Sequence, residues 1–450
     1  MGKILPVRQA DVMTSRDPPP RFPERADVIV IGAGPAGIAA ATTAAECGAS
    51  VLLLDENYAP GGQIWRRGPA SPPRLAQRWL DRLTSSRTRV ESGVAVADAR
   101  RVAETASFEL LVCRDRRAHR ISATHIVLCT GAREQFLPFP GWTLPGVVGV
   151  GGAQALFKSG ARVEGKRVVI AGSGPLLLPV AATLSRAGAR LMIVAEQAPF
   201  WRVARFAAGL WRTPSLLAQA AAYRRSFTSV RYATGVWVTR ADGYDRLEQV
   251  TLTDGVASWV QPCDQLCTGY GLVPETRLAA LLGCELEHGM VRVDQLQSTS
   301  VDGVWAAGEP TGIGGLTKAL AEGEVAGLAL GQRPREARAR ARHLLGARAA
   351  SARLARAFAL RSELRSVATP DTIVCRCEDV PLGAILPVAG FRRSRVHARL
   401  GMGACQGRIC GDAVAWLHGW DPEPPRIPVV PVPLAALGSE RAHSPEHDGA

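Results

Sequence analysis

The sequence lacks the features that would place the protein in a membrane, in a secretory pathway or on a nucleic acid. It contains no run of about 18–20 uncharged apolar residues, so no membrane-spanning helix is expected. Its first residues have no apolar core of the signal-peptide type. The formal charge is +14 at pH 7, but no basic cluster is interleaved with aromatic residues. We therefore expect a cytoplasmic protein that binds no nucleic acid, either free or held at the inner membrane face through a partner.

The ten cysteines do not have the pattern of a disulfide framework. Those beside apolar runs are expected to be small buried residues: Cys47, Cys113, Cys129 and Cys284. A metal or redox role stays open for Cys263 and Cys267, at the predicted end of a strand. The histidines have no serine or carboxylate partner at a motif spacing, so no catalytic acid, base or nucleophile is assigned.

Two segments of equal length repeat one pattern. GAGPAGIAAATTAAECG spans residues 32–48, and GSGPLLLPVAATLSRAG spans residues 172–188. Each follows an apolar run typical of a strand (ADVIVI or KRVVIA) and precedes another (SVLLLDE or ARLMIVAE). Strand, tight glycine turn, helix and strand form the βαβ unit of dinucleotide-binding domains. The sequence therefore predicts an α/β fold with two Rossmann-like, three-layer domains.

The first unit has the glycines that a bound dinucleotide needs. Gly32 permits the tight turn, Gly34 lets the backbone approach a pyrophosphate, and Gly37 lets the helix pack on the strand. The helix is expected to begin at Pro35 and Ala36, where its free N–H groups and positive dipole end face the phosphates.

An acidic pair ends the second strand of this unit. Asp55, followed by Glu56, provides a carboxylate that accepts hydrogen bonds from ribose hydroxyls and repels a 2′-phosphate. FAD and NAD both satisfy this pattern, so the motif alone does not choose between them.

Three further segments favour FAD. GGQ follows the acidic pair, where the middle of the flavin nucleotide would pass. HIVLCTGA is an apolar strand that ends in Thr-Gly, and AAGE places a carboxylate after a strand, suited to a ribitol hydroxyl. The candidate flavin-binding residues of these segments are Gly62, Gln63, Thr130, Gly131, Gly308 and Glu309. A Rossmann-like domain without a flavin is the alternative, which the four elements together disfavour.

The second unit departs from the pattern at two positions. Gly172 and Gly174 match, but Leu177 stands where the third glycine is expected. The position of the ribose-binding carboxylate is Ala195, with Glu196 one residue later, so this carboxylate is expected to be missing or displaced. NAD(P), another adenine nucleotide and an empty scaffold kept for packing are the alternatives for this site.

No cysteine pair stands beside the predicted flavin. The run after Ala59-Pro60 is GGQIWRRG, and the second domain contains no C-x-x-C. Flavoprotein disulfide reductases need a redox cysteine pair, so dithiol chemistry is not expected.

Four cysteines gather late in the sequence. VCRCEDV contains a C-x-C and GMGACQGRICG a C-x₄-C, and the four residues are Cys375, Cys377, Cys405 and Cys410. A two-iron cluster needs four converging thiolates, and the glycines around the second pair let backbone N–H groups approach the sulfurs. A zinc site and free thiols are the alternatives, although structural zinc sites favour C-x₂₋₄-C pairs. The sequence therefore predicts a [2Fe–2S] cluster on these cysteines.

Residues 26–332 resemble the two-dinucleotide-binding-domain flavoprotein oxidoreductases, with Glu309 where the usual residue is aspartate. CRCEDV followed by GMGACQGRIC resembles the [2Fe–2S] domain of the bacterioferritin-associated-ferredoxin type, with a shorter linker between the cysteine pairs. With PFPGWTLPGVVGVGGAQ, AGSGPLLLPVA and PVPLAAL, the chain resembles the FAD- and cluster-containing subunit of the opine oxidase family. That family includes the corresponding subunits of hydroxyproline and proline dehydrogenases and of hydrogen cyanide synthase.

The resemblance implies a division of labour. A smaller flavoprotein subunit of the D-amino-acid-oxidase type would oxidise an amino acid, imino acid or opine. The present chain would relay the electrons through FAD and the cluster to an unknown acceptor. Cyanide formation from glycine is one case of this interpretation. The alternatives are a stand-alone NAD(P)H-dependent FAD/[2Fe–2S] reductase and a scaffold subunit that does not turn over.

The predicted organisation divides the chain into seven segments. They are a flexible lead-in (1–25), the first part of the FAD-binding domain (26–160), an NAD(P)-binding-like domain (161–264), the second part of the FAD-binding domain (265–332), a helical connector (333–370), a small helical [2Fe–2S] domain (371–420) and a Pro-rich tail (421–450).

Overall fold

The structure is a computed structural model that describes residues 22–66, 72–158, 160–212, 214–342, 344–388, 390–420 and 423–434. Most of the predicted lead-in and the last part of the predicted tail lie outside the described residues. Among the helices of the described part, none is long and apolar enough to span a membrane.

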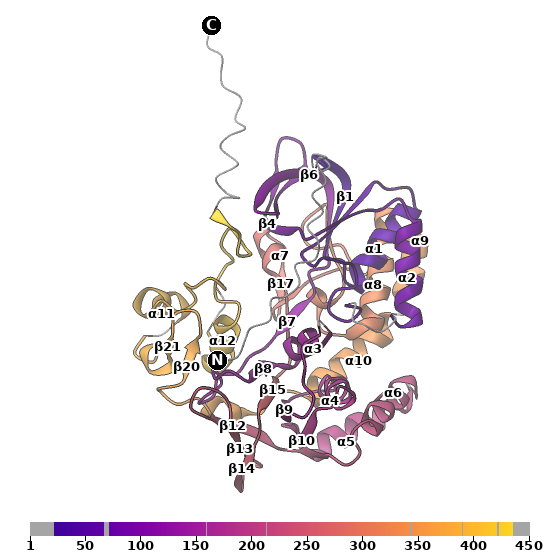
Figure 1. Ribbon diagram of the computed structural model, residues 1–450. Helices are drawn as coiled ribbons and strands as arrows, with labels where there is room; N and C mark the ends of the chain where they lie inside the picture. The colour runs from indigo at the N-terminus through magenta and orange to yellow at the C-terminus, as the bar shows by residue number, and fades with distance from the viewer. Residues whose placement is uncertain are drawn as a thin grey trace, which may run out of the picture.

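In the described part of the chain, the first domain is built on a mixed sheet with the strand order β3-β2-β1-β6-β5-β4 and β19 beside β6 (Figure 1). Its strands are β1 (Arg25–Ile31), β2 (Val51–Asp55), β3 (Arg89–Ser92), β4 (Ala95–Val102), β5 (Ser107–Arg114), β6 (Arg117–Leu128) and β19 (Val304–Ala306). Side chains of β1 alternate between two cores, with Val28 and Val30 in one and Ile29 and Ile31 in the other. The apolar run of β1 is therefore buried on both faces, as a central parallel strand requires.

Helices α1 (Pro35–Glu46), α2 (Arg74–Ser85) and α8 (Gly315–Leu330) share one of these cores. α1 and α8 lie against each other through small residues. A Cβ at Gly323 would lie 2.2 Å from the carbonyl oxygen of Ala36, and one at Gly327 would lie 2.7 Å from that of Ala40. Each helix follows a parallel strand, so both begin at the carboxyl edge of the sheet, where ligands bind in open α/β folds.

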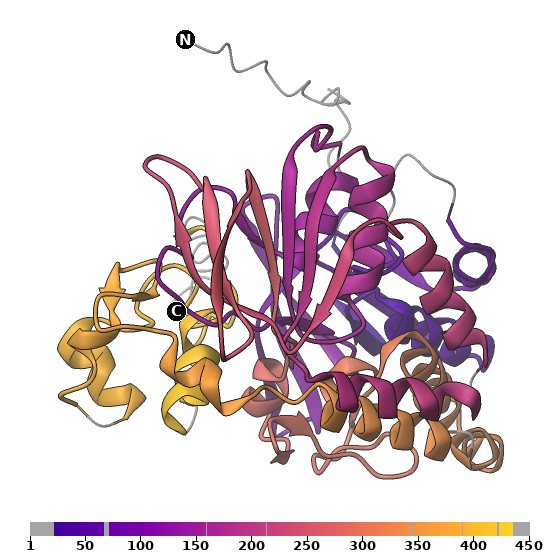
Figure 2. The ribbon, with the colours of Figure 1, turned by 90° about the horizontal axis from the view of Figure 1, so that it is seen from below.

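The second domain has a parallel sheet in the order β11-β10-β9-β15-β8 (Figure 2). Its strands are β8 (Val147–Gly149), β9 (Arg167–Gly172), β10 (Arg190–Glu196), β11 (Arg231–Thr234) and β15 (Gln265–Gly269). A meander of β12 (Trp237–Asp242), β13 (Gln249–Thr253) and β14 (Ser258–Pro262) packs on one face. The other face carries α3 (Val150–Lys158) and α4 (Leu177–Arg186), and α5 (Phe200–Gly209) and α6 (Pro214–Arg225) follow β10.

Both predicted Rossmann-like units are confirmed, but the predicted domain boundaries differ from the sheets. β8 and α3 precede residue 160, yet β8 pairs with β15 in the second sheet. β15 itself follows residue 264 and pairs with β9. The sequence did not indicate this crossover because β8 is only three residues long, too short to show a strand period.

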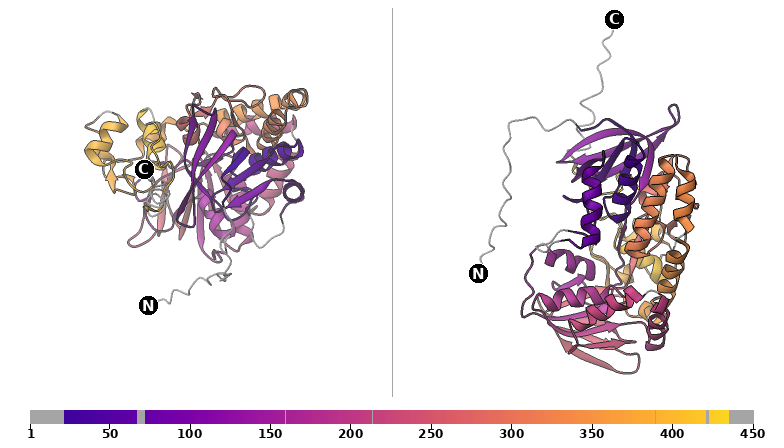
Figure 3. Two further views of the ribbon diagram at one scale, coloured as in Figure 1. Left: turned by 90° about the horizontal axis from the view of Figure 1, so that it is seen from above. Right: turned by 90° about the vertical axis from the view of Figure 1, so that its right-hand side faces the viewer.

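Two short antiparallel strands, β7 (Ala132–Glu134) and β16 (Leu272–Pro274), pair where the chain crosses between the two domains. α7 (Arg277–Leu281) and the hairpin of β17 (Leu286–Glu287) and β18 (Met290–Val291) pack on the first domain, and η2 (Glu309–Thr311) follows β19. The connector forms α9 (Pro334–Arg342) and α10 (Leu344–Ala357), which run in orange along one side of the molecule (Figure 3).

The cysteine segment forms a small unit with a core of its own. Its elements are η3 (Ser362–Ser366), β20 (Ile373–Cys375), β21 (Val380–Pro381), η4 (Leu382–Ala384), α11 (Phe391–Ala398) and α12 (Cys410–His418). The core residues are Val374, Cys375, Val380, Leu382, Ile385, Phe391, Leu400, Cys410 and Val414. This unit lies to the side of the two larger domains (Figure 1), and its assignment to the ferredoxin type stays a prediction.

Candidate cofactor sites

The turn between β1 and α1 leaves open space at its middle glycine. A Cβ at Gly32 would lie 2.3 Å from the carbonyl oxygen of Cys129, and one at Gly37 would lie 1.8 Å from that of Gly32. Both positions therefore require glycine. By contrast, no atom lies within 4 Å of the Cβ position of Gly34. Gly34 is the N-cap of α1, so unpaired N–H groups of the helix border a space that suits an anionic pyrophosphate.

Asp55 braces this turn. Its Oδ2 accepts a hydrogen bond of 2.5 Å from the N–H of Ala33. Its Oδ1 accepts two of 2.7 Å from the N–H and the side-chain amide of Asn57. Glu56, the other predicted acidic residue, is exposed. The carboxylate thus lies at the carboxyl end of β2 beside the glycine turn, and its contact with a ribose stays a prediction.

Two other predicted flavin segments meet the same turn. A Cβ at Gly62 would lie 2.9 Å from the Cα of Gly34, and one at Gly308 would lie 2.8 Å from the Cβ of Ala36. Segments from distant parts of the sequence therefore converge at the N-terminus of α1. This convergence fits the space that an extended flavin dinucleotide needs.

Thr130 and Gly131 follow β6, the neighbour of β1. The hydroxyl of Thr130 donates to the carbonyl of Glu275 at 2.5 Å, and the N–H of Glu275 donates to the carbonyl of Gly131 at 3.0 Å. Gln63 is exposed, and its carbonyl accepts a hydrogen bond of 3.5 Å from Nζ of Lys158 on α3. The predicted flavin segments thus connect the two domains.

Glu309 caps the N-terminus of α8. Its carboxylate accepts hydrogen bonds of 2.9 Å from the N–H groups of Gly314 and Gly315. Burial raises the pKa of this carboxyl group. Its predicted contact with a ribitol hydroxyl stays a prediction.

Sequence reasoning missed a buried ion pair that supports this loop. Nζ of Lys318 lies 2.8 Å from Oε2 of Glu322 and donates to the carbonyls of Gly308 and Gly312 at 2.8 and 2.9 Å. Both side chains are almost fully buried, and a buried charge persists only when it is paired. The sequence feature that could have indicated this ion pair is a Lys and a Glu four residues apart in a helix otherwise rich in Ala, Gly and Leu.

The second unit has its carboxylate at Glu196. A bulge between Leu191 and Ile193 adds one residue to β10, so Glu196 pairs with Gly172 across the sheet. The expectation of a missing or displaced carboxylate at Ala195 is therefore wrong. Counting residues from the glycines could not reveal an insertion inside a strand.

The hydrogen bonds of Glu196 repeat those of Asp55. Glu196 accepts from the N–H of Gly174, 22 residues earlier, at 2.7 Å and from that of Ala198, two residues later, at 2.8 Å. Asp55 bonds N–H groups at the same two separations. Burial, opposed by these hydrogen bonds, raises the pKa of Glu196 to about 7.

The second turn is covered by the connector of the same chain. The ring of Phe358, just after α10, lies 3.9 Å from the Cβ position of Gly174 and packs edge-on against Phe206. The hydroxyl of Ser173 donates to the carbonyl of Phe358 at 2.8 Å. The side chain of Gln197 donates to that hydroxyl at 2.8 Å. The space that is open at the first turn is therefore occupied at the second.

The four late cysteines form two thiol pairs. Cys375 is hydrogen-bonded to Cys410, and Cys377 to Cys405. The first pair is buried, whereas Cys377 is exposed and Cys405 is half-buried. Cys375 accepts hydrogen bonds from the thiol of Cys410 and from the N–H groups of Gly401, Cys377 and Glu378. These hydrogen bonds lower the pKa of Cys375 to about 6, although its burial opposes them.

This donor set fits a two-iron cluster. A [2Fe–2S] cluster takes four cysteine thiolates, and N–H groups aimed at sulfur are the usual supporting contacts. Within the described residues, no three His, Cys, Asp or Glu side chains are grouped to hold a metal ion. The cysteines instead lie as two contacting pairs, and their ligand role stays a prediction.

Arg133 joins the flavin segments to the cysteine unit. It lies on β7, two residues after Gly131, and pairs with Asp412 of α12. It also donates to the carbonyl of Arg408 at 2.7 Å. Asp412 and Arg408 flank Cys410, so this contact places the buried thiol pair on the side of the flavin segments. Burial lowers the pKa of Arg133, opposed by Glu275.

Known proteins resemble the chain along most of its length. A family model described as pyridine nucleotide-disulphide oxidoreductase matches residues 26–323. The HcnB subunit of hydrogen cyanide synthase from Pseudomonas aeruginosa is 33% identical, with 92% of this chain and 99% of that protein covered. An opine oxidase subunit from Agrobacterium tumefaciens is 30% identical, with 86% and 84% covered.

A solved structure shares the fold. L-proline dehydrogenase from P. horikoshii has a TM-score of 0.68 at 20% identity, over 93% of this chain and 80% of that chain. With the open first turn and the segments that converge on it, these similarities agree on one assignment. The chain belongs to the pyridine nucleotide-disulphide oxidoreductase family of FAD-dependent oxidoreductases, together with HcnB and the opine oxidase subunit.

Proposed function

We propose that the chain is the electron-relaying FAD and [2Fe–2S] subunit of a heteromeric dehydrogenase that acts on an amino acid, imino acid or opine. By name, its relatives are subunits of hydrogen cyanide synthase and of opine oxidase. The observation that carries the proposal is the contrast between the two glycine turns: Gly34 borders open space, while Phe358 lies over Gly174. Electrons then come from a partner rather than from NAD(P)H. We propose as partner a smaller, D-amino-acid-oxidase-like flavoprotein in the cytoplasm.

Residues of this chain would hold the two redox groups. FAD would lie on the open first turn, with the N-terminus of α1 facing its pyrophosphate, and the four late cysteines would bind the cluster. When bound, the flavin converts two-electron into one-electron transfer. Arg133 would keep the cysteine unit docked beside the flavin segments through Asp412.

Anaerobic reduction of the purified chain tests this proposal. Under argon, we expect NADH and NADPH to leave the flavin absorbance unchanged, and dithionite to bleach both flavin and cluster. The purified chain should contain about one FAD and about two irons. Absence of FAD, or less than about one iron per chain, would contradict the proposal.

A stand-alone NAD(P)H-dependent reductase is the second candidate. Glu196 favours it, because the carboxylate that was expected to be missing or displaced is present and accepts hydrogen bonds at the same separations as Asp55. Rapid bleaching of the flavin by NADH would establish this function and remove the need for an electron-donating partner.

A cysteine substitution distinguishes electron relay from a scaffold role. We expect Cys375→Ser to retain FAD and to lose at least about tenfold of the electron transfer from the partner to a one-electron acceptor. Cys284→Ser, at a buried thiol outside the cysteine unit, serves as the matched control and should retain both. Undiminished activity of the Cys375→Ser complex would identify the chain as a scaffold.

A further inference from the structure

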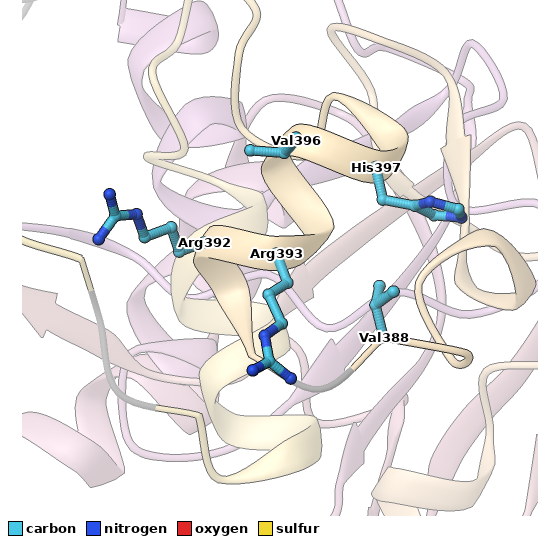
Figure 4. A pocket seen from close by; sticks show the side chains of 5 residues that line it. All are labelled: Val388, Arg392, Arg393, Val396 and His397. Carbon is cyan, nitrogen blue, oxygen red and sulfur yellow. The ribbon is translucent and has the colours of Figure 1, made fainter.

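The outer surface of α11 carries a shallow basic pocket. Its lining residues are Val388, Arg392, Arg393, Val396 and His397. Figure 4 shows the side chains of Arg392 and Arg393 extending away from the helix. Among the described residues, the ion pairs of α11 and its C-cap involve Arg395 and Arg399, whereas Arg392 and Arg393 have no acidic partner and are exposed.

One face of α11 leads from this pocket to the exposed thiol pair. Arg392, Val396 and Arg399 are spaced i, i+4 and i+7, so they follow one side of the helix and its C-cap. Nε of Arg399 donates to Oε2 of Glu378 at 2.7 Å, and Glu378 directly follows Cys377. We call these three residues, with Arg393 and Cys377, the α11 face.

Apolar side chains lie exposed on and beside the α11 face. Val396 is 82% exposed, and Met402, in the loop that leads to Cys405, is 50% exposed. A Cβ at Gly403 would lie 2.2 Å from the Cβ of Cys377, so this loop packs directly on the exposed cysteine. The thiol pair that faces solvent therefore lies beside exposed apolar side chains.

The charge carried by α11 and its flanking loops is positive. Residues 380–411 contain no Asp or Glu, and their arginines are Arg392, Arg393, Arg395, Arg399 and Arg408. Glu378 is paired with Arg399, and Glu423 with Arg395. Arg392 and Arg393 are thus left without an acidic partner in the described structure, and the exposed acidic residue nearest to Glu378 is Asp379.

We propose that the α11 face is the electron exit of this protein and docks an acidic one-electron carrier protein. The inference rests on the proposed function, because it needs the cluster on the four cysteines. Exposed apolar side chains beside the unpaired Arg392 and Arg393 suit a small, transient interface in which complementary charge orients the partner. Each docking event would move one electron from the reduced cluster to the oxidised carrier, with no bond made and no proton transferred.

Charge reversal of the full-length chain tests the proposal. Arg392→Glu with Arg393→Glu is compared with Arg335→Glu with Arg338→Glu on α9, two arginines equally exposed and on the opposite side of the molecule (Figure 1). The probes are oxidised cytochrome b5, which is acidic, and oxidised cytochrome c, which is basic. Binding is measured by calorimetry at low and at physiological ionic strength.

We expect the unmodified chain to bind cytochrome b5 more tightly than cytochrome c, and salt to weaken this binding. The α11 pair of substitutions should weaken it at least tenfold, the α9 pair less than twofold, and Arg392→Lys with Arg393→Lys should preserve it. Iron content and the electron paramagnetic resonance spectrum after dithionite reduction should be the same in all variants.

Three results would overturn the proposal. In the first, the unmodified chain does not bind cytochrome b5. In the second, the α9 and α11 substitutions weaken this binding equally. In the third, the smaller flavoprotein no longer copurifies with the α11 variant. The last would make the α11 face the interface with that flavoprotein instead. Failure of the proposed function is distinguishable, because the unmodified chain would then lack iron.

Discussion

The two glycine turns share one backbone design but border different surroundings. In each, a carboxylate at the end of the neighbouring strand accepts hydrogen bonds from N–H groups 22 residues before it and two after it. Beyond Gly34 there is open space, whereas Phe358 lies beyond Gly174. The comparison shows that two turns with the same backbone design can differ in what borders their middle glycine.

The third glycine position explains part of this difference. Gly37 lets α1 pack so closely that a Cβ would clash with the carbonyl of Gly32. At the equivalent position stands Leu177, the first residue of α4, whose side chain is fully buried in a core of the second domain. α4 therefore places a large apolar side chain in the core of the second domain, whereas α1 packs closely against the strand that precedes it.

Filling the first turn should have the largest effect. Gly34 has φ −72°, which other residues adopt without strain, and its Cβ position is open, so Gly34→Leu should fold. The side chain would occupy the space of the pyrophosphate, and we expect FAD affinity to fall about a thousandfold, or about 4 kcal/mol. Flavin content after gel filtration and circular dichroism measure the two effects. Gly346→Leu on α10, whose Cβ position is also open, is the control and should retain FAD.

Removing the carboxylate of the second turn should change the pH dependence of stability. The pKa of Glu196 is raised by burial to about 7, above its ordinary value of 4.5, so the folded protein binds more protons than the unfolded chain between these values. The free energy of unfolding should therefore fall by about 3 kcal/mol as pH rises from about 4.5 to 7.

Urea denaturation of the wild type and of Glu196→Gln at several pH values measures this effect. The variant should lose this part of the pH dependence, whatever its stability at a single pH. If the free energy of unfolding changed with pH equally in both proteins, Glu196 would be ionised in the folded state over this pH range.

Uncovering the second turn should have the smallest effect. Phe358→Ala removes the ring beside Gly174 and its contact with Phe206, at a cost of about 1–2 kcal/mol because Phe358 is only half-buried. We expect weak NADH binding to appear, with a Kd in the millimolar range or about −4 kcal/mol, as measured by fluorescence titration. Leu354→Ala on the connector is the control. Equal NADH binding by the wild type would show that Phe358 does not close the site.

Local patterns predicted the parts of the molecule that depend on neighbours in sequence. The glycine turns, their flanking strands and the helix that begins at Pro35 follow from short spacings and apolar runs. The carboxylate position was assigned to Ala195 instead of Glu196 because a bulge within β10 changes the register by one residue without a sequence signal. Lys318 and Glu322 were missed because their pairing depends on the loop after β19, which closes over them.

The sequence by itself determined that this protein has two Rossmann-like units and a set of four late cysteines. Only the tertiary structure decided which turn stays open, which thiols pair and which pair reaches the surface. The contact between Ser173 and Phe358 joins residues 185 positions apart, and that between Arg133 and Asp412 joins residues 279 apart. Backbone geometry within a turn is set by residue type and short spacing, whereas contacts over such separations depend on how whole domains pack.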